Sequence, residues 1–100
     1  MRYEEELQAI YDSRQSFYGK AKIEIFENDD VLTKQLLSYG TLVANYVYYK
    51  KEKKEVFEHF GTYSQTTSRH QKEFFKQLGL SDGEIKKLIG DRLEKIENEK

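Results

Sequence analysis

Hydroxyl and cationic side chains are concentrated in one short stretch of the chain, at residues 64–70. The stretch contains Ser64, Thr66, Thr67 and Ser68, with Arg69 and His70 directly after them. A helix that begins here would offer unpaired backbone N–H groups and the positive end of its dipole to a ligand. The residue types therefore predict a site for a phosphate or another anion, with Arg69 as its cation. In the structural alternative, Ser64 only caps the helix and the threonines fill its first turn.

A second candidate segment is residues 11–20, a dense polar and aromatic stretch without a regular period. Tyr18 could stack on a nucleobase while Arg14 and Lys20 meet phosphates, as in proteins that bind single strands. The alternative is an arm packed across a sheet, with Phe17 and Tyr18 filling the core. The candidate binding surface taken from both segments comprises Arg14, Tyr18, Lys20, Ser64, Thr66, Thr67, Arg69 and His70.

The two histidines of the chain, His59 and His70, do not have the spacing of a metal site or a catalytic motif. The chain has no cysteine, which excludes disulfides, zinc–thiolate sites, iron–sulfur clusters and thiol nucleophiles. We therefore expect a protein that is not an enzyme and that holds no metal and no cofactor. His70 is expected on the sheet-facing side of its helix, hydrogen-bonded to a backbone group or to a tyrosine.

The overall charge of the chain is nearly balanced, with 17 lysines and arginines against 18 aspartates and glutamates. The formal net charge of -1 provides no long-range attraction to nucleic acid or to an anionic membrane, so any contact with nucleic acid must be local. The acidic start does not resemble a signal peptide, and no apolar run approaches the roughly 20 residues that span a bilayer. These features predict a soluble cytoplasmic protein without a membrane contact.

The middle of the chain has the period of two that is typical of half-buried strands. Ala21, Ile23 and Ile25 alternate with charged residues, which indicates a strand that begins near residue 20. Further strands are expected over residues 32–39, 41–49 and 55–60. Four consecutive strands with short links predict an antiparallel meander. A short amphipathic helix is expected earlier, at residues 4–10.

Two helices are expected after the strands. The first begins at Ser64, or one turn later at Ser68, and ends near Gly79. The second begins with the capping box of residues 81–84 and continues to residue 99. Its apolar stripe either covers the core of the protein or forms the seam of a homodimer. The stripe consists of Ile85, Leu88, Ile89, Leu93 and Ile96.

Several separated motifs of the chain resemble those of a known family of small proteins. They are Tyr11-Asp12-Ser13-Arg14, residues 16–21, residues 38–44 and Tyr63-Ser64 with Thr66-Thr67, Arg69-His70 and Glu73-Phe74. The pattern is similar to a domain of unknown function from phages and mobile elements of Gram-positive bacteria, over about residues 11–79. The resemblance implies a genetic context in which small proteins inhibit or redirect host machinery, including defence systems such as CRISPR nucleases.

These observations predict one α+β domain over residues 1–100. Residues 11–79 form a four-stranded antiparallel meander with a helix packed on it, and residues 81–99 form a terminal amphipathic helix. The leading functional hypothesis is a non-enzymatic phage or mobile-element protein that occupies a host protein or ribonucleoprotein complex, as an anti-defence or anti-CRISPR inhibitor does. The alternative is a module that binds nucleic acid or nucleotide phosphate through the Ser64–His70 helix start.

Overall fold

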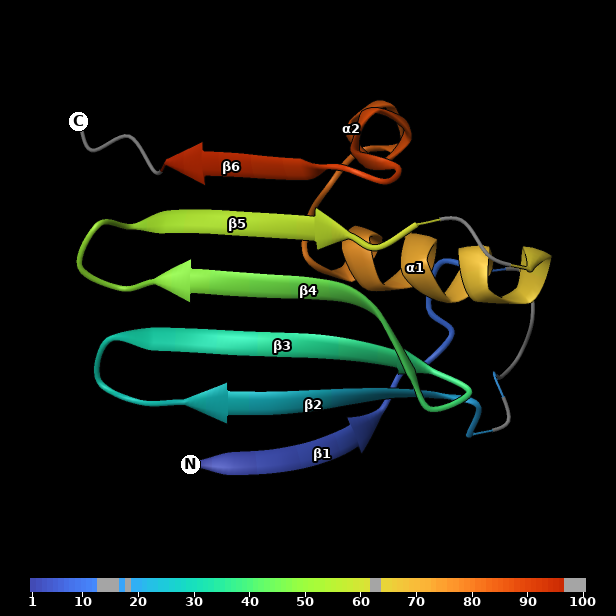
Figure 1. Cartoon of the computed structure of the whole chain (residues 1–100), viewed down its shortest axis with the longest axis horizontal. Helices are drawn as coiled ribbons and strands as arrows, with labels where there is room; N and C mark the ends of the chain where they lie inside the picture. The colour runs from blue at the N-terminus through green and yellow to red at the C-terminus, as the bar shows by residue number, and fades with distance from the viewer. Residues whose placement is uncertain (13–16, 18, 62–63, 97–100) are drawn as a thin grey trace.

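The computed structural model describes residues 1–12, 17, 19–61 and 64–96, which form one antiparallel sheet and two helices (Figure 1). In chain order the elements are β1 (Arg2–Glu6), β2 (Ala21–Glu27), β3 (Val31–Ser38), β4 (Thr41–Tyr49), β5 (Lys54–His59), α1 (Gln65–Gln77), α2 (Asp82–Leu88) and β6 (Arg92–Ile96). The six strands lie in the sheet in the order of the chain, β1-β2-β3-β4-β5-β6. The predicted α+β class with two helices and an antiparallel sheet is confirmed, but the predicted number of four strands is wrong.

The four predicted strands form the centre of the sheet as β2 to β5. Burial alternates along β2, where Ala21, Ile23 and Ile25 are buried. A two-residue turn joins β3 to β4, with left-handed φ angles of 52° at Tyr39 and 81° at Gly40. Positive φ at both central residues is the type I′ turn, whose twist matches that of the flanking strands. Glycine adopts this conformation freely, whereas it strains a bulky residue such as Tyr39.

The N-terminal residues form an edge strand, so the helix predicted at residues 4–10 is wrong. β1 pairs with β2 from Arg2 opposite Phe26 to Glu6 opposite Lys22, which satisfies backbone groups that β2 would otherwise leave unpaired. Leu7 follows the strand and is buried in the core, with 3% of its surface exposed. The spacing of Leu7 and Ile10 suggested a helix, but Ile10 is 64% exposed and takes no part in the core.

The second helix ends at Leu88, so the prediction of a helix to residue 99 is also wrong. Gly90 has a φ of 70°, and the backbone N–H of Asp91 donates to the carbonyl oxygen of Leu88 at 2.7 Å, which reverses the chain. The chain then pairs with β5 as β6. The Nζ atom of Lys95 in β6 contacts Oε2 of Glu84 at 2.6 Å and joins the new strand to the start of α2. The capping box expected at Ser81 and Glu84 is present.

The five residues of the predicted apolar stripe therefore do not share one helix face. Ile85 and Leu88 are buried in the core, while Ile89 at the end of α2 is 51% exposed. Leu93 packs against the core from β6, and Ile96 is 67% exposed on the opposite side of that strand. These residues therefore do not form a homodimer seam along one helix.

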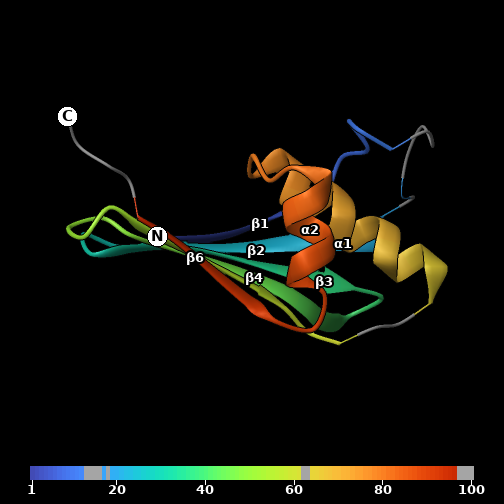
Figure 2. The same ribbon diagram turned by 90° about the horizontal axis from the view of Figure 1, so that it is seen from above.

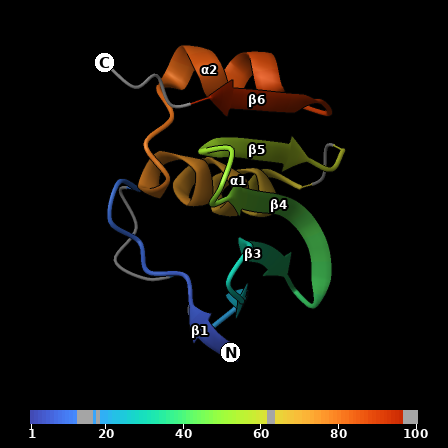
Figure 3. The ribbon, with the colours of Figure 1, turned by 90° about the vertical axis from the view of Figure 1, so that its left-hand side faces the viewer.

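The two helices lie on the same face of the sheet and cover one end of it (Figure 2). α1 packs on β3 and β4, while α2 packs on β5 (Figure 3). The core between the layers contains Ile23, Ile25, Leu36, Phe57, Phe74 and Phe75, all buried. The opposite face of the sheet carries no helix among the described residues.

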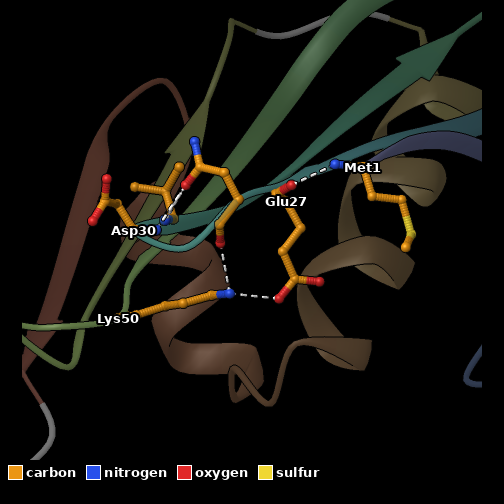
Figure 4. Close-up of polar contacts among 6 residues, drawn as sticks. Met1, Glu27, Asp30 and Lys50 are labelled. Atoms are coloured by element: carbon orange, nitrogen blue, oxygen red, sulfur yellow. Dashed lines mark hydrogen bonds and ion pairs between the residues drawn. The ribbon is translucent and has the colours of Figure 1, made fainter.

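The end of the sheet away from the helices is held together by polar contacts (Figure 4). The Nζ atom of Lys50 donates to Oε2 of Glu27 and to the carbonyl oxygen of Asn28, each at 2.7 Å. The hydrogen bond and the positive charge of Lys50 lower the pKa of Glu27. Oδ1 of Asn28 accepts the backbone N–H groups of Asp30 and Val31, at 2.8 and 2.9 Å. These contacts fix the β2–β3 turn without help from a helix.

Candidate functional site

The start of α1 confirms the structural use predicted for Ser64. Its Oγ accepts the backbone N–H of Thr67 at 3.3 Å and lies 3.4 Å from the Thr67 hydroxyl. The helix begins at Gln65, so the alternative start at Ser68 is wrong. Because the Ser64 oxygen already accepts an N–H of the first turn, the cap leaves fewer free groups for a ligand than the sequence suggested.

Thr67 and His70 belong to a buried hydrogen-bonded chain rather than to the surface. Oγ of Ser38 in β3 lies 3.0 Å from Oγ1 of Thr67 and 2.8 Å from Nδ1 of His70. The His70 ring is fully buried and packs edge-on to the ring of Phe17, with centroids 4.7 Å apart. The expected sheet-facing position of His70 is confirmed. Of the neighbouring residues, Thr66 is half-buried and Ser68 is exposed.

Glu73 is a buried site residue that the sequence analysis missed. Its Oε1 atom accepts the backbone N–H groups of Ile10, Tyr11 and Asp12, at 3.1, 2.8 and 2.9 Å. Its Oε2 atom accepts Nε2 of Gln77 at 2.7 Å. Three consecutive amides around one oxygen form a nest of the kind that binds anions, and here a side chain of the protein occupies it.

Three cations of α1 line a hollow of about 240 Å³ beside this nest. They are Arg69, Lys72 and Lys76, and the hollow is completed by Tyr11, Asp12 and Glu73. The spacing of three and four residues places the cations on one side of the helix. We call this feature the cationic hollow.

The cations of the hollow differ in their partners. Asp82 lies 3.0 Å from Nζ of Lys76 and 4.0 Å from Nζ of Lys72. The hydrogen bond from Lys76 is the main cause that lowers the pKa of Asp82, so this carboxylate stays ionised. Nζ of Lys76 also lies 6.0 Å from the centroid of the Tyr11 ring. Arg69 is half-buried and makes no ion pair with any residue that the structure describes.

The structure does not bring the whole predicted surface together. Lys20 is exposed and lines a different hollow of about 460 Å³, together with Lys22, Tyr39 and Gly40. Arg14 and Tyr18 lie outside the described residues. Among the predicted binding residues that the structure describes, Arg69 is therefore the one that lines the cationic hollow.

Among residues 1–12, 17, 19–61 and 64–96, no group of three or more His, Cys, Asp or Glu side chains could hold a metal ion. Within the same ranges, no helix has the length and apolar character needed to cross a membrane.

The chain is similar to a known protein family. The sequence profile of a family described as "Family of unknown function (DUF8033)" matches residues 5–92. The match includes β2 to β5 and both helices, and it reaches the first residue of β6. The expectation of a family of unknown function is confirmed, over a longer stretch than residues 11–79. No curated protein and no solved structure matches the chain.

Proposed function

Since the chain belongs to the family of unknown function DUF8033, we propose its role from its own surface: a non-enzymatic binding protein whose cationic hollow holds an acidic group of a partner protein. The observation that carries the proposal is the state of Arg69. Its guanidinium group lines the hollow without an ion pair to a described residue, while Lys72 and Lys76 share Asp82. A carboxylate that enters the hollow would gain a bidentate partner in Arg69.

The rim of the cationic hollow suits a protein partner. Tyr11 is 59% exposed and Ile10, next to it, is 64% exposed. Arginine and tyrosine are enriched among the few residues that dominate the binding energy of protein interfaces. An exposed aromatic ring beside an arginine that makes no ion pair with a described residue therefore supports a docking site for an acidic segment of a protein.

The biological setting of the partner extends the same proposal. We propose a phage or mobile-element protein that acts in the cytoplasm of a host cell and occupies a host protein or ribonucleoprotein complex, as an anti-defence or anti-CRISPR inhibitor does. The support is the resemblance of the Tyr11–Arg14, Ser38–Ala44 and Tyr63–Phe74 motifs to proteins of that origin. The balanced net charge of -1 also favours a specific protein contact over general attraction to nucleic acid.

A nucleic-acid or nucleotide phosphate is the second candidate ligand. A guanidinium group binds phosphate with the same bidentate geometry as carboxylate, so the cationic hollow suits both. The hydroxyl groups around the helix start add little to this alternative, because the Ser64 and Thr67 hydroxyls already bond to each other and the Thr67 hydroxyl also bonds to Ser38. The phosphate alternative thus depends on Arg69 as well.

The test is capture of partners from host cells with the tagged protein, before and after nuclease treatment. Arg69→Ala is compared with Lys87→Ala, which removes an exposed cation of α2 outside the hollow. We expect a protein that survives nuclease treatment, binds the purified Lys87→Ala variant normally, and binds Arg69→Ala at least tenfold more weakly. Capture that disappears with nuclease would favour the phosphate alternative. Equal binding to both variants would show that the hollow is not the docking site.

A further inference from the structure

The sheet face opposite the helices carries apolar side chains in two of its rows. Cross-strand register places Phe26, Thr33, Val47 and Val56 side by side in one row across β2 to β5. Val31 and Tyr49 pair in the next row of this face toward the β2–β3 turn, and Ile96 lies in that row on β6, with Lys54 of β5 between Tyr49 and Ile96. Phe26 is 44%, Tyr49 36% and Ile96 67% exposed. Both helices lie on the other side of the sheet, so no helix of the described part covers this face (Figure 2). Thr33 and Val47 are half-buried, and Val56 is already buried within the chain, with 3% of its surface exposed.

The charged residues at the two edges of this face follow a regular order. In the row of Phe26, the β1 edge carries Arg2 and the β6 edge carries Glu94. In the row of residues 24, 35, 45 and 58, the β1 edge carries Glu4 and the β6 edge carries Arg92. Each row therefore ends in opposite charges, and the order of the charges is reversed between the two rows.

A two-fold axis that runs parallel to the strands, between β3 and β4, would bring oppositely charged edge residues of two copies together in both rows. It places β1 over β6 of a second copy, β2 over β5 and β3 over β4. Arg2 then faces Glu94 of the second copy, and Glu4 faces Arg92 of the second copy. Two sheets packed face to face align their strands within about 30° at a separation of about 10 Å, a geometry in which long charged side chains at the edges can meet.

The central residues of the face also match under this axis. Phe26 lies over Val56 of the second copy and Thr33 over Val47, so the contact covers the exposed part of Phe26 and the half-buried Thr33 and Val47. Polar Gln35 lies over polar Asn45. One pair is unfavourable, because Glu24 faces Glu58, although Glu58 is held by Nδ2 of Asn45 at 3.1 Å. We propose that a second copy of this chain packs on the open sheet face and forms a two-fold symmetric sandwich, an interface separate from the cationic hollow.

The first test is the mass of the protein in solution, measured by light scattering and sedimentation up to about 500 μM, well above the micromolar range of weak specific complexes. Phe26→Glu places a charge in the apolar row. Tyr3→Glu is the matched control, since Tyr3 is 48% exposed and pairs with buried Ile25 on the helix-bearing face. We expect a dimer for the unmodified chain and for Tyr3→Glu, and at least tenfold weaker dimerisation for Phe26→Glu.

A charge exchange tests the axis itself and involves no buried residue. Glu94 also pairs with Lys54 and Arg92 of its own chain, at 2.6 and 3.0 Å, so the Glu94→Arg variant alone is the control for the loss of these contacts. Arg2→Glu should weaken the dimer because it faces Glu94 of the second copy, and adding Glu94→Arg in the same chain should restore it. Circular dichroism of each variant confirms that the sheet is intact. A chain that stays monomeric at about 500 μM, or a dimer that Phe26→Glu and Arg2→Glu leave unchanged, would overturn the proposal.

Discussion

Glu73 is expected to hold the segment before β2 against α1, and its removal gives the sharpest test of the fold. The Glu73→Ala variant leaves the N–H groups of residues 10–12 and the amide of Gln77 without the carboxylate that they contact. Hydrogen bonds to a charged group contribute about 1.5–3 kcal/mol each, but bonds to one oxygen are not additive, and water can enter at the half-buried end of the nest. We expect the free energy of unfolding to fall by about 2–4 kcal/mol.

Urea unfolding followed by circular dichroism measures this loss. With an m-value of about 1.5 kcal/mol per molar, the midpoint should shift down by roughly 2 M. Glu73→Gln keeps one acceptor oxygen but turns an NH₂ group toward Gln77, so its loss should be about half as large. Hydrogen exchange should accelerate at the amides of Ile10, Tyr11 and Asp12 in both variants.

Ser68→Ala is the control, because Ser68 is exposed on the same helix, and it should change the free energy of unfolding by less than about 0.5 kcal/mol. The reasoning is refuted if Glu73→Ala lies within about 0.5 kcal/mol of the unmodified protein and exchange at residues 10–12 is unchanged.

Three further predictions concern the helix start, the cationic hollow and pH. Ser64→Ala should lower the free energy of unfolding by about 0.5–2 kcal/mol in urea titrations, because Ser64 caps α1, and a smaller effect would contradict the capping role. Arg69→Ala should alter the same quantity by less than about 0.5 kcal/mol; a larger loss would identify Arg69 as a structural residue. Burial lowers the pKa of His59, whose Nδ1 accepts the N–H of Gly90 at 3.0 Å, in a region also lined by Lys72, Asp82 and Lys86. The unfolded chain therefore binds a proton first, so stability should be full above about pH 6.5 and fall as the pH is lowered toward the folded-state pKa; equal slopes in His59→Gln and the unmodified protein would contradict this assignment.

The central strands and the caps of both helices were predictable because their signals are local. Alternation at Ala21, Ile23 and Ile25 reports a strand with one buried face, and Ser64 and Ser81 each lie at the start of a helical period. Such patterns depend on residues that are close in sequence, so they can be recognised without knowing the long-range contacts of the chain.

The edge strands could not be predicted in the same way. β1 is exposed at all five positions, so no apolar alternation marks it. In β6, Leu93 and Ile96 are three residues apart and continue the helical spacing of Ile85 and Leu88. Both segments are strands because each pairs with a neighbouring strand. The energy of that pairing leaves no signal in the local sequence.

The nest around Glu73 could not be predicted from the sequence either. The carboxylate meets the N–H groups of residues 10–12 across 61 to 63 positions of the chain. Lys72 and Lys76 looked like ordinary solvent-exposed lysines of a helix, and they became part of a site only when Tyr11 and Asp12 closed the hollow beside them. Arg69 was identified for its neighbours in sequence, whereas its proposed role depends on its neighbours in space.

The order of the strands has a consequence for the kinetics of folding. β2, β3 and β4 each pair with the next strand along the chain through a short turn, so three hairpins can close with little loss of loop entropy. β6 differs, because both helices separate it from β5. Its pairing requires the longest chain closure within the sheet and should follow the docking of α1 and α2. Substitutions in β6 should then accelerate unfolding while leaving the rate of folding nearly unchanged.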